Sequence, residues 1–283
     1  MSKVIELRNK TRSITQINKA AEAMQIVAVA QLKGIQSRQR AAYHFKKHYS
    51  RLAKRLGIND LSVAKSSQQT VLIYVLTSQR GFCGGFNESL ITQLGSFIGE
   101  QQQAGKEVQL VVIGKKGCEL CQERGMPGVI KQVATLDKAG FEQATRDIAA
   151  DYQRYRQGQI KELYIFFNEF SSILIQKPRK QQVFPFDLSG IDVVAENIIF
   201  DLPIPSVRDH VALQYTKAVF YDAFMQTCLG EVGSRLMTMR NATESSKEMI
   251  DALSLKLNKA RQAMITVELS EILSSFEILA EEA

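Results

Sequence analysis

Both ends of this 283-residue chain are free of proline over long stretches and carry apolar residues at helical spacing. Residues 3–56 contain no proline and one glycine, Gly34. Their apolar positions alternate steps of three and four residues, the repeat of a coiled-coil seam. A helix of this length would extend for about 80 Å at 1.5 Å per residue. The predicted seam positions are Ile14, Ile17, Ala21, Met24, Ala28, Gln31 and Ile35.

The carboxyl-terminal end repeats this pattern, without proline, from residue 206 onward. Two prolines precede Ser206, which together with Asp209 matches the capping box of a helix start. A helix over residues 206–279 would be about 110 Å long. The predicted seam positions are Val232, Leu236, Met239, Thr243, Ser246, Ile250, Leu253, Leu257, Ala260, Met264, Val267, Glu271 and Ser274.

Two such seams separated by a globular middle predict an antiparallel coiled coil in which the first and last residues share one tip. A compact helical bundle is less favoured, because too few other helices exist to cover rods this long. The segment 263–279 is rich in large apolar side chains, and a two-stranded seam buries only part of them. Leaving the rest in water is costly, so the tip is predicted to fit inside another protein or a higher homo-oligomer.

The middle of the chain alternates strand-like and helical patterns, which indicates a small open α/β sheet. The chain is therefore divided into an N-terminal coiled-coil helix (1–60), a Rossmann-like α/β domain (65–188) and a C-terminal coiled-coil helix (206–283), with a linker over 187–205. Predicted strands are 70–77, 108–113 and 163–167, with an antiparallel addition at 173–176 and 183–184. Predicted helices are 87–103, 116–123 and 141–155.

No catalytic centre, metal site or cofactor site emerges from the residue patterns. The turn Arg80–Asn87 lies between a strand and a helix, where phosphate-binding loops occur, but it matches neither glycine-rich nucleotide motif. It is interpreted mainly as a tight, glycine-dependent turn. Cys118 and Cys121 would need two further ligands to bind zinc, and few cysteines and histidines are available. Nucleotide binding by a Rossmann-like enzyme is kept as a minor alternative.

The charge of the chain is unevenly distributed. Residues 1–56 carry a net charge of +11, and the remainder carries −4. A basic arm on a slightly acidic body predicts an acidic partner, and a coiled-coil adaptor that binds nucleic acid or a membrane surface is the main alternative function. Few cysteines, no apolar run of membrane-spanning length and no signal-like amino terminus lead us to expect a soluble intracellular protein.

Four stretches resemble the gamma subunit of F-type ATP synthases. They are Met239-Arg-Asn-Ala-Thr-Glu-Ser-Ser-Lys-Glu-Met-Ile250, the motif Asn258-Lys-Ala-Arg-Gln-Ala-Met-Ile-Thr-Val-Glu-Leu269 within 257–272, the start from Leu7 to Ala28, and the turn Arg80-Gly-Phe-Cys-Gly-Gly-Phe-Asn87. The resemblance covers essentially the whole chain in order. It implies a non-catalytic central rotor shaft that couples ion-driven rotation of a c-ring to ATP synthesis or hydrolysis at the beta subunits. The implied partners are the alpha and beta subunits, an epsilon-type subunit and the c-ring, with no nucleic acid. The implied location is peripheral, on the cytoplasmic face of the cell membrane.

The resemblance also implies contact residues for these partners. The following residues would meet the alpha and beta subunits: Arg8, Lys10, Arg12, Met24, Arg261, Gln262, Thr266, Glu268, Leu269 and Ile272. The following basic residues, lower on the shaft, would meet the epsilon-type subunit or the c-ring: Arg38, Arg40, Lys46 and Lys47. Glu22 replaces a lysine expected in the family, and Met264 replaces a small residue. These departures would suit a divergent or second F-type complex.

Overall fold

The computed structural model describes residues 2–61, 64, 69–133, 138–191 and 203–281. It divides into two compact units, Met1–Val27 with Thr238–Ala283, and Ala28–Met237. Two long helices, α1 (Ser2–Arg55) and α5 (Ile204–Glu281), contribute to both units and confirm the predicted long helices at the two ends of the chain. None of the described helices combines the length and the hydrophobicity that crossing a membrane requires.

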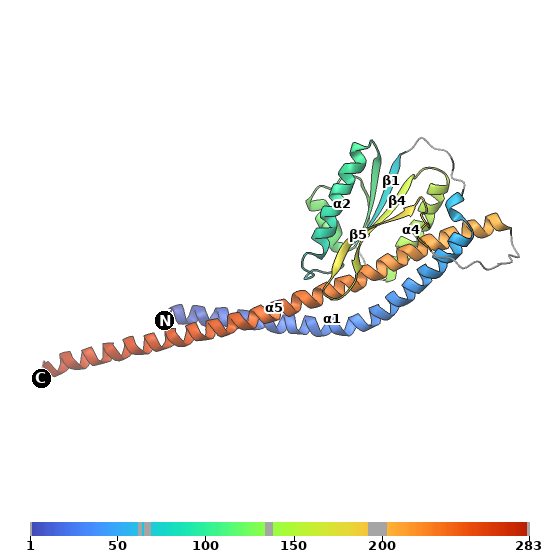
Figure 1. The fold of residues 1–283 in the computed structure, drawn as a ribbon. Helices are drawn as coiled ribbons and strands as arrows, with labels where there is room; N and C mark the ends of the chain where they lie inside the picture. Colours follow the sequence, from blue (N-terminus) through green and yellow to red (C-terminus); the bar gives the residue numbers. More distant parts are fainter. Residues whose placement is uncertain (1, 62–63, 65–68, 134–137, 192–202, 282–283) are drawn as a thin grey trace. The chain divides into compact units, whose positions relative to one another are not determined.

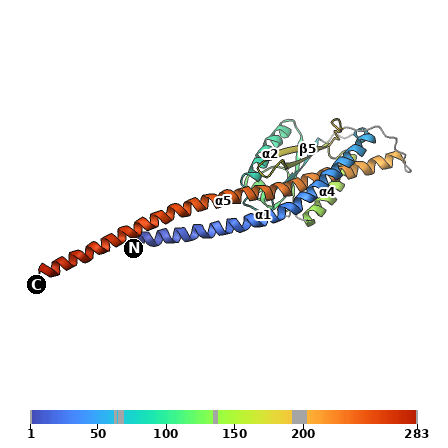
Figure 2. The same cartoon turned by 60° about the horizontal axis from the view of Figure 1, so that its bottom comes forward.

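In the first unit, residues 2–27 of α1 lie antiparallel beside the part of α5 that follows Thr238 (Figure 1, Figure 2). The ammonium of Lys247 lies 3.3 Å from the Glu22 carboxylate, which ties the two helices across the pair. This arrangement confirms the antiparallel coiled coil that the two heptad patterns predict.

The seam of α1 differs from the prediction in every second position. Ile14 and Ala21 are in the seam as expected, but Asn18 and Gln25 complete it in place of Ile17 and Met24, which are exposed. Both sets alternate steps of three and four residues, so the spacing alone could not distinguish them. The real seam is more polar than the predicted one, and large apolar side chains are left on the outside of the pair.

The seam of α5 follows the prediction as far as Met264 and then ends. Val267, Glu271 and Ser274 were predicted in the seam and are exposed. The Glu22–Lys247 pair places the start of α1 level with roughly residue 267 of α5 at 1.5 Å per residue. The two chain ends therefore do not share one tip as expected, because α5 continues past the first residue of α1 (Figure 1).

The second unit contains a five-stranded sheet with the order β3-β2-β1-β4-β5. Its strands are β1 (Thr70–Leu76), β2 (Glu107–Ile113), β3 (Val129–Val133), β4 (Glu162–Phe170) and β5 (Gln176–Phe184). The pairs of β1 with β2 and β4, and of β2 with β3, are parallel, and β5 is antiparallel to β4. The remaining helices are α2 (Phe86–Gln103), α3 (Lys115–Glu123), α4 (Lys138–Arg156) and the 3-10 turn Ile58–Asp60. The small open α/β sheet is thus confirmed.

The central strand β1 is buried on both faces, and its side chains alternate between two cores. Val71, Ile73 and Val75 pack in one core with α2 and α3. Leu72, Tyr74 and Leu76 pack in the other core with α4, α5 and the end of α1 (Figure 1). The long helix α5 is therefore part of the hydrophobic core of the α/β domain through residues 211–225.

Three local predictions were wrong. The edge strand β3 was missed, because Lys131 and Gln132 interrupt its short apolar pattern. Ser171 and Ser172 donate their amides to the carbonyl of Ile175, so residues 171–175 form a turn and the last strand begins only at Gln176. Helix α5 begins at Ile204, two residues before the predicted cap, since the Pro205 ring fits a first helical turn that needs no N–H donor. The linker segment 192–202 lies outside the described residues.

Candidate partner-binding surfaces

A basic groove lies on the first unit, beside the seam. Its volume is about 520 Å³, and Arg8, Arg12 and Lys19 line it together with Leu257 of α5. Lys10 is exposed and forms an ion pair with Glu6 at 2.7 Å, and this contact lowers the pKa of the Glu6 carboxyl. The structure therefore brings Arg8 and Arg12 together, one helical turn apart, and leaves Lys10 outside the groove. Two guanidiniums and an ammonium in one groove favour an acidic partner.

An apolar surface accompanies these charges on α1. Met24 is 39% exposed and Ile26 is 71% exposed, and Ile17 and Val27 are exposed as well. Because the seam uses Asn18 and Gln25 instead, these large side chains stay in water within this chain. Clusters of large exposed apolar side chains are typical of protein–protein contact surfaces.

The predicted contact residues of α5 all lie on its exposed surface near the carboxyl terminus. Thr266 donates its hydroxyl to the Gln262 carbonyl at 3.0 Å, a bond within the helix, and Arg261 and Glu268 are exposed. More than half of the surface of Leu269 and of Ile272 is exposed. The helix thus presents both polar and large apolar side chains to solvent near its carboxyl terminus.

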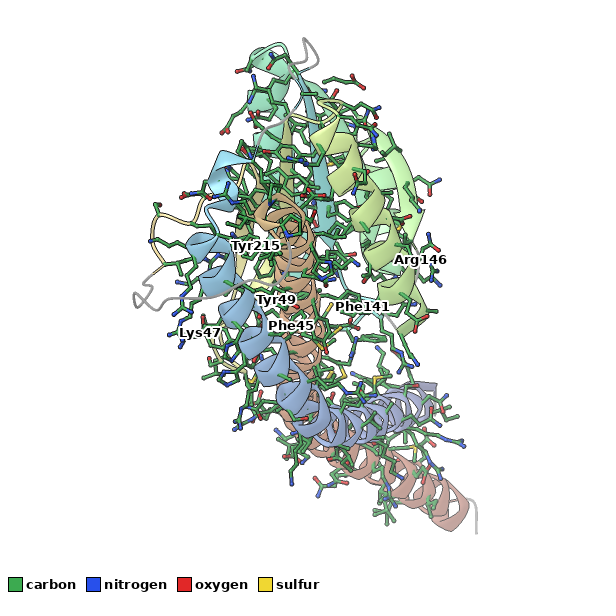
Figure 3. The ribbon with its side chains drawn as sticks, turned by 90° about the vertical axis from the view of Figure 1, so that its right-hand side faces the viewer. Phe45, Lys47, Tyr49, Phe141, Arg146 and Tyr215 are labelled. Carbon is green, nitrogen blue, oxygen red and sulfur yellow. The ribbon has the colours of Figure 1, made fainter. Side chains whose placement is uncertain are left out.

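The basic residues lower on α1 belong to the second unit and have different environments. Arg38 lines an apolar groove of about 680 Å³ between α1, α4 and α5, whose walls include Phe45 and Phe141 (Figure 3). Arg40 and Lys47 are exposed, and Figure 3 shows Lys47 on the outer side of α1. Lys46 instead turns inward and pairs with the buried Asp222 at 2.6 Å.

The turn after β1 confirms the interpretation as a tight turn and shows why it is an unsuitable phosphate site. The amides of Gln79 and Arg80 donate to the carboxylate of Glu231 on α5, at 3.0 and 3.1 Å. A phosphate would need donors of this kind, and here a carboxylate of the same chain occupies them. Sequence reasoning missed Glu231, because its position within a long helix gives no sign that it reaches a loop some 150 residues away.

The cysteines show no sign of reactive or metal-binding chemistry. Burial raises the pKa of the Cys121 thiol to about 11 and that of Cys228 to about 12, so both are protonated near neutral pH. Within the described ranges, no group of three or more histidine, cysteine, aspartate or glutamate side chains is arranged to hold a metal ion.

Leu257 offers a test of the basic groove, since it is a half-buried seam residue that lies among three cations. We expect Leu257→Lys to lower the free energy of unfolding by about 2 kcal/mol, through lost burial and like-charge repulsion. Leu257→Asp is expected to cost about half as much, because the cations compensate the new carboxylate. Urea unfolding of the purified chain measures both, with the exposed Leu255→Lys as the control. If Leu257→Lys and Leu257→Asp lower the free energy of unfolding equally, the three cations do not lie around residue 257 as described.

The chain combines a long antiparallel helix pair, exposed apolar and basic surfaces, and an α/β domain whose loop amides after β1 are bound by a carboxylate of its own helix α5. These features define a structural subunit that acts through partners. Comparison with known proteins agrees with this class. A family model described as ATP synthase matches residues 3–279. The chain is 32% identical to the ATP synthase gamma chain of Dinoroseobacter shibae, over 99% of this chain and 100% of that one. It is 30% identical to the gamma chain of Dechloromonas aromatica, over 95% and 96% of the two chains.

This chain belongs to the ATP synthase gamma-chain family, whose members are non-catalytic components of their complexes. Solved structures show the same fold at low sequence identity. A rotor chain of the Euglena gracilis mitochondrial ATP synthase superposes with a TM-score of 0.66 at 15% identity, covering 93% of this chain and 99% of that one. A chain from another structure of that enzyme, comprising OSCP, F1 and the c-ring, gives a TM-score of 0.70 at 14% identity, with coverages of 98% and 95%.

Proposed function

We propose that this chain is the central rotor shaft of an F-type ATP synthase and transmits torque between an ion-driven c-ring and the catalytic beta subunits. Family membership over nearly the whole chain is the observation that supports the role most directly. Its proposed partners are the alpha and beta subunits, an epsilon-type subunit and the c-ring. The complex holds it at the cytoplasmic face of the membrane. The comparisons give no support to an adaptor that binds nucleic acid.

The contact with the head is proposed to combine two kinds of surface. The exposed apolar residues of α5 beyond the seam, among them Leu269 and Ile272, provide an apolar contact inside the ring of alpha and beta subunits. The groove around Arg8 and Arg12 provides a basic contact for acidic loops of that ring. Arg261, Gln262, Thr266 and Glu268 lie on the same exposed part of α5, and Met24 extends the apolar contact on α1.

The basic residues of the second unit are proposed to serve the other partners. Arg38, Arg40 and Lys47 are exposed and can approach acidic groups of the epsilon-type subunit or polar loops of the c-ring. Lys46 has a different role, because its ammonium already pairs with Asp222 inside the chain.

Shaft rotation performs work by presenting different faces of this asymmetric helix pair to each catalytic site in turn. A site changes its conformation only if the shaft makes different contacts with its alternative states. The basic groove lies on one side of the helix pair, and exposed apolar residues such as Ile17 and Met24 lie outside the groove. When the pair rotates, a subunit that stays in place therefore meets surfaces of different charge and hydrophobicity.

The double variant Leu269→Asp/Ile272→Asp tests this proposal. Each buried aliphatic side chain is worth roughly 1.5–3 kcal/mol, so affinity for the head subunits is expected to fall at least tenfold. Because both side chains are exposed in this chain, its own unfolding temperature is expected to stay unchanged. Reconstitution with alpha and beta subunits, followed by size-exclusion chromatography, measures the affinity. Ile130→Asp, an equally exposed site on the edge strand β3, serves as the control. Unaltered assembly of the double variant would contradict the proposed contact.

A further inference from the structure

The carboxyl edge of the sheet contains a topological switch point, the position at which other α/β proteins bind ligands. The chain leaves β1 to reach β2 on one side, and β4 lies on the other side of β1. In open parallel sheets, ligands bind at such a switch point, outside the carboxyl ends of the strands. Here the loop 78–87 after β1 lies at this position, and Asn168 near the end of β4 donates its amide to the Phe86 carbonyl at 2.8 Å.

The loop 78–87 is held in one conformation by a compact hydrogen-bond network. The Ser78 amide donates to the Asn87 side-chain carbonyl at 2.9 Å, and the Asn87 side-chain amide donates back to the Ser78 hydroxyl at 2.7 Å. Phe82 has a φ of 61°, which is unfavourable for a bulky side chain and persists only where the surroundings enforce it. The side chain of Phe82 is exposed, so packing within the chain does not offset this strain.

Helix α5 contacts this loop through Glu231, which is 6% exposed. One carboxylate oxygen accepts the Gln79 amide at 3.0 Å, and the other accepts the Arg80 amide at 3.1 Å. Successive backbone amides beside a helix start are donors that other proteins direct at phosphate. The carboxylate therefore binds the loop in the way that a bound anion would.

Arg235 and Ser234 donate hydrogen bonds to backbone carbonyls of the same loop. The Arg235 guanidinium pairs with Glu231 and also donates to the carbonyls of Gly81 and Arg80, at 3.3 and 3.4 Å. The Ser234 hydroxyl donates to the Cys83 carbonyl at 2.6 Å. Glu231 and Arg235 lie one helical turn apart, so a single face of α5 binds both the donors and the acceptors of the loop.

These contacts differ in kind from the apolar packing of α5 against the domain over residues 211–225. Apolar contacts resist separation but have no preferred direction, so two surfaces that share them can slide. Hydrogen bonds to charged groups are directional and about twice as strong as neutral ones. A rotation of α5 about its own axis, or a shift along it, would break several charged bonds of buried groups together.

We propose that Glu231 and Arg235 are positioning residues that fix the α/β domain at one rotational angle on α5, so that torque passes between them. The inference rests on the proposed rotor function. We call the contact of Glu231 and Arg235 with the loop 78–87 the joint between α5 and the α/β domain. Neither residue belongs to a predicted partner contact, and both are used within the chain. The Glu231 carboxylate, which accepts two amides of the loop after β1, is thus central to the contact that fixes the domain on the helix.

Hydrogen exchange of the full-length chain tests the joint itself. Glu231→Gln keeps the shape of the side chain and removes its charge, so the loop amides lose a charged acceptor and Arg235 loses its partner. Exchange of the amides of residues 79 and 80 is expected to become roughly tenfold faster. Glu244→Gln is the matched control, because Arg240 and Glu244 form an ion pair with the same spacing on α5 but are 61% exposed. If the amides of residues 79 and 80 exchange at an unchanged rate in Glu231→Gln, the proposal that Glu231 holds this loop is wrong.

The assembled complex tests whether the joint carries torque. Ion pumping per ATP hydrolysed is expected to fall several-fold in Glu231→Gln, with ATP hydrolysis retained, and to stay unchanged in Glu244→Gln. If Glu231→Gln speeds amide exchange in the loop but leaves the number of ions pumped per ATP unchanged, the proposal is overturned. The contact would then stabilise the loop without transmitting torque. If Glu231→Gln does not assemble, Glu231→Asp decides, with an intermediate ratio in support and an unchanged one against. Failure of the unmodified chain to join the head subunits would instead contradict the proposed function and leave the exchange result intact.

Discussion

Lys46→Met is expected to destabilise the folded chain by about 3 kcal/mol, the cost of removing one partner from a buried ion pair. The Asp222 side chain is 1% exposed and receives the Lys46 ammonium at 2.6 Å and the Gln226 side-chain amide at 2.9 Å, both on the same oxygen. Within the described part of the chain, the other carboxylate oxygen has no hydrogen-bond partner. Methionine keeps the packing of the lysine stem, so the change isolates the loss of the charge.

Lys47→Met is the control for this prediction. Lys47 is the next residue of α1 and is exposed, so its replacement is expected to change the free energy of unfolding by less than about 0.5 kcal/mol. Urea unfolding of the two purified variants gives the difference directly. A loss of equal size in both variants would show that Lys46 does not hold Asp222. A double variant Lys46→Met/Asp222→Leu is expected to recover most of the stability.

The long helices and the sheet could be predicted because they depend on regular patterns. The heptad spacing over 232–264 and the near-continuous apolar run of β1 predict a helix and a strand without reference to any partner. The family motif Asn258–Leu269 added the role that pattern alone left open. The elements that were missed or misplaced, such as β3 and the start of α5, are short or depend on a single turn.

The direction of individual side chains could not be predicted in the same way. Ile17 and Asn18 both fit the spacing of the α1 seam, and only the position of α5 shows that Asn18 faces inward. Lys46 and Lys47 look equivalent in a basic stretch, yet one pairs with a buried carboxylate 176 residues away. Glu231 likewise contacts Gln79 in a loop 152 residues away. Long-range polar contacts of this kind leave no periodic signal, so they need the folded structure.

Gly230→Leu is expected to destabilise the chain by about 3 kcal/mol by forcing α5 away from the loop that it binds. Gly230 lies inside the continuous helix α5, at a position of close packing. A Cβ atom at residue 230 would lie 2.9 Å from the ring of Phe86, which belongs to the loop 78–87 and is the first residue of α2. Phe86 is 5% exposed and its carbonyl is bonded to Asn168, so it has little freedom to move.

Gly34→Leu is the matched control substitution, and we expect it to raise the free energy of unfolding rather than lower it. Gly34 lies inside α1, and a Cβ atom there would have no neighbouring atom within 4 Å. Leucine forms helix better than glycine, so this variant is expected to gain about 0.5–1 kcal/mol. Urea unfolding measures both variants, and hydrogen exchange of the loop 78–87 is expected to rise in Gly230→Leu alone. If Gly230→Leu proves as stable as the unmodified chain, the close approach of α5 to the α/β domain is not required, and the domain could rest on the helix without a fixed angle.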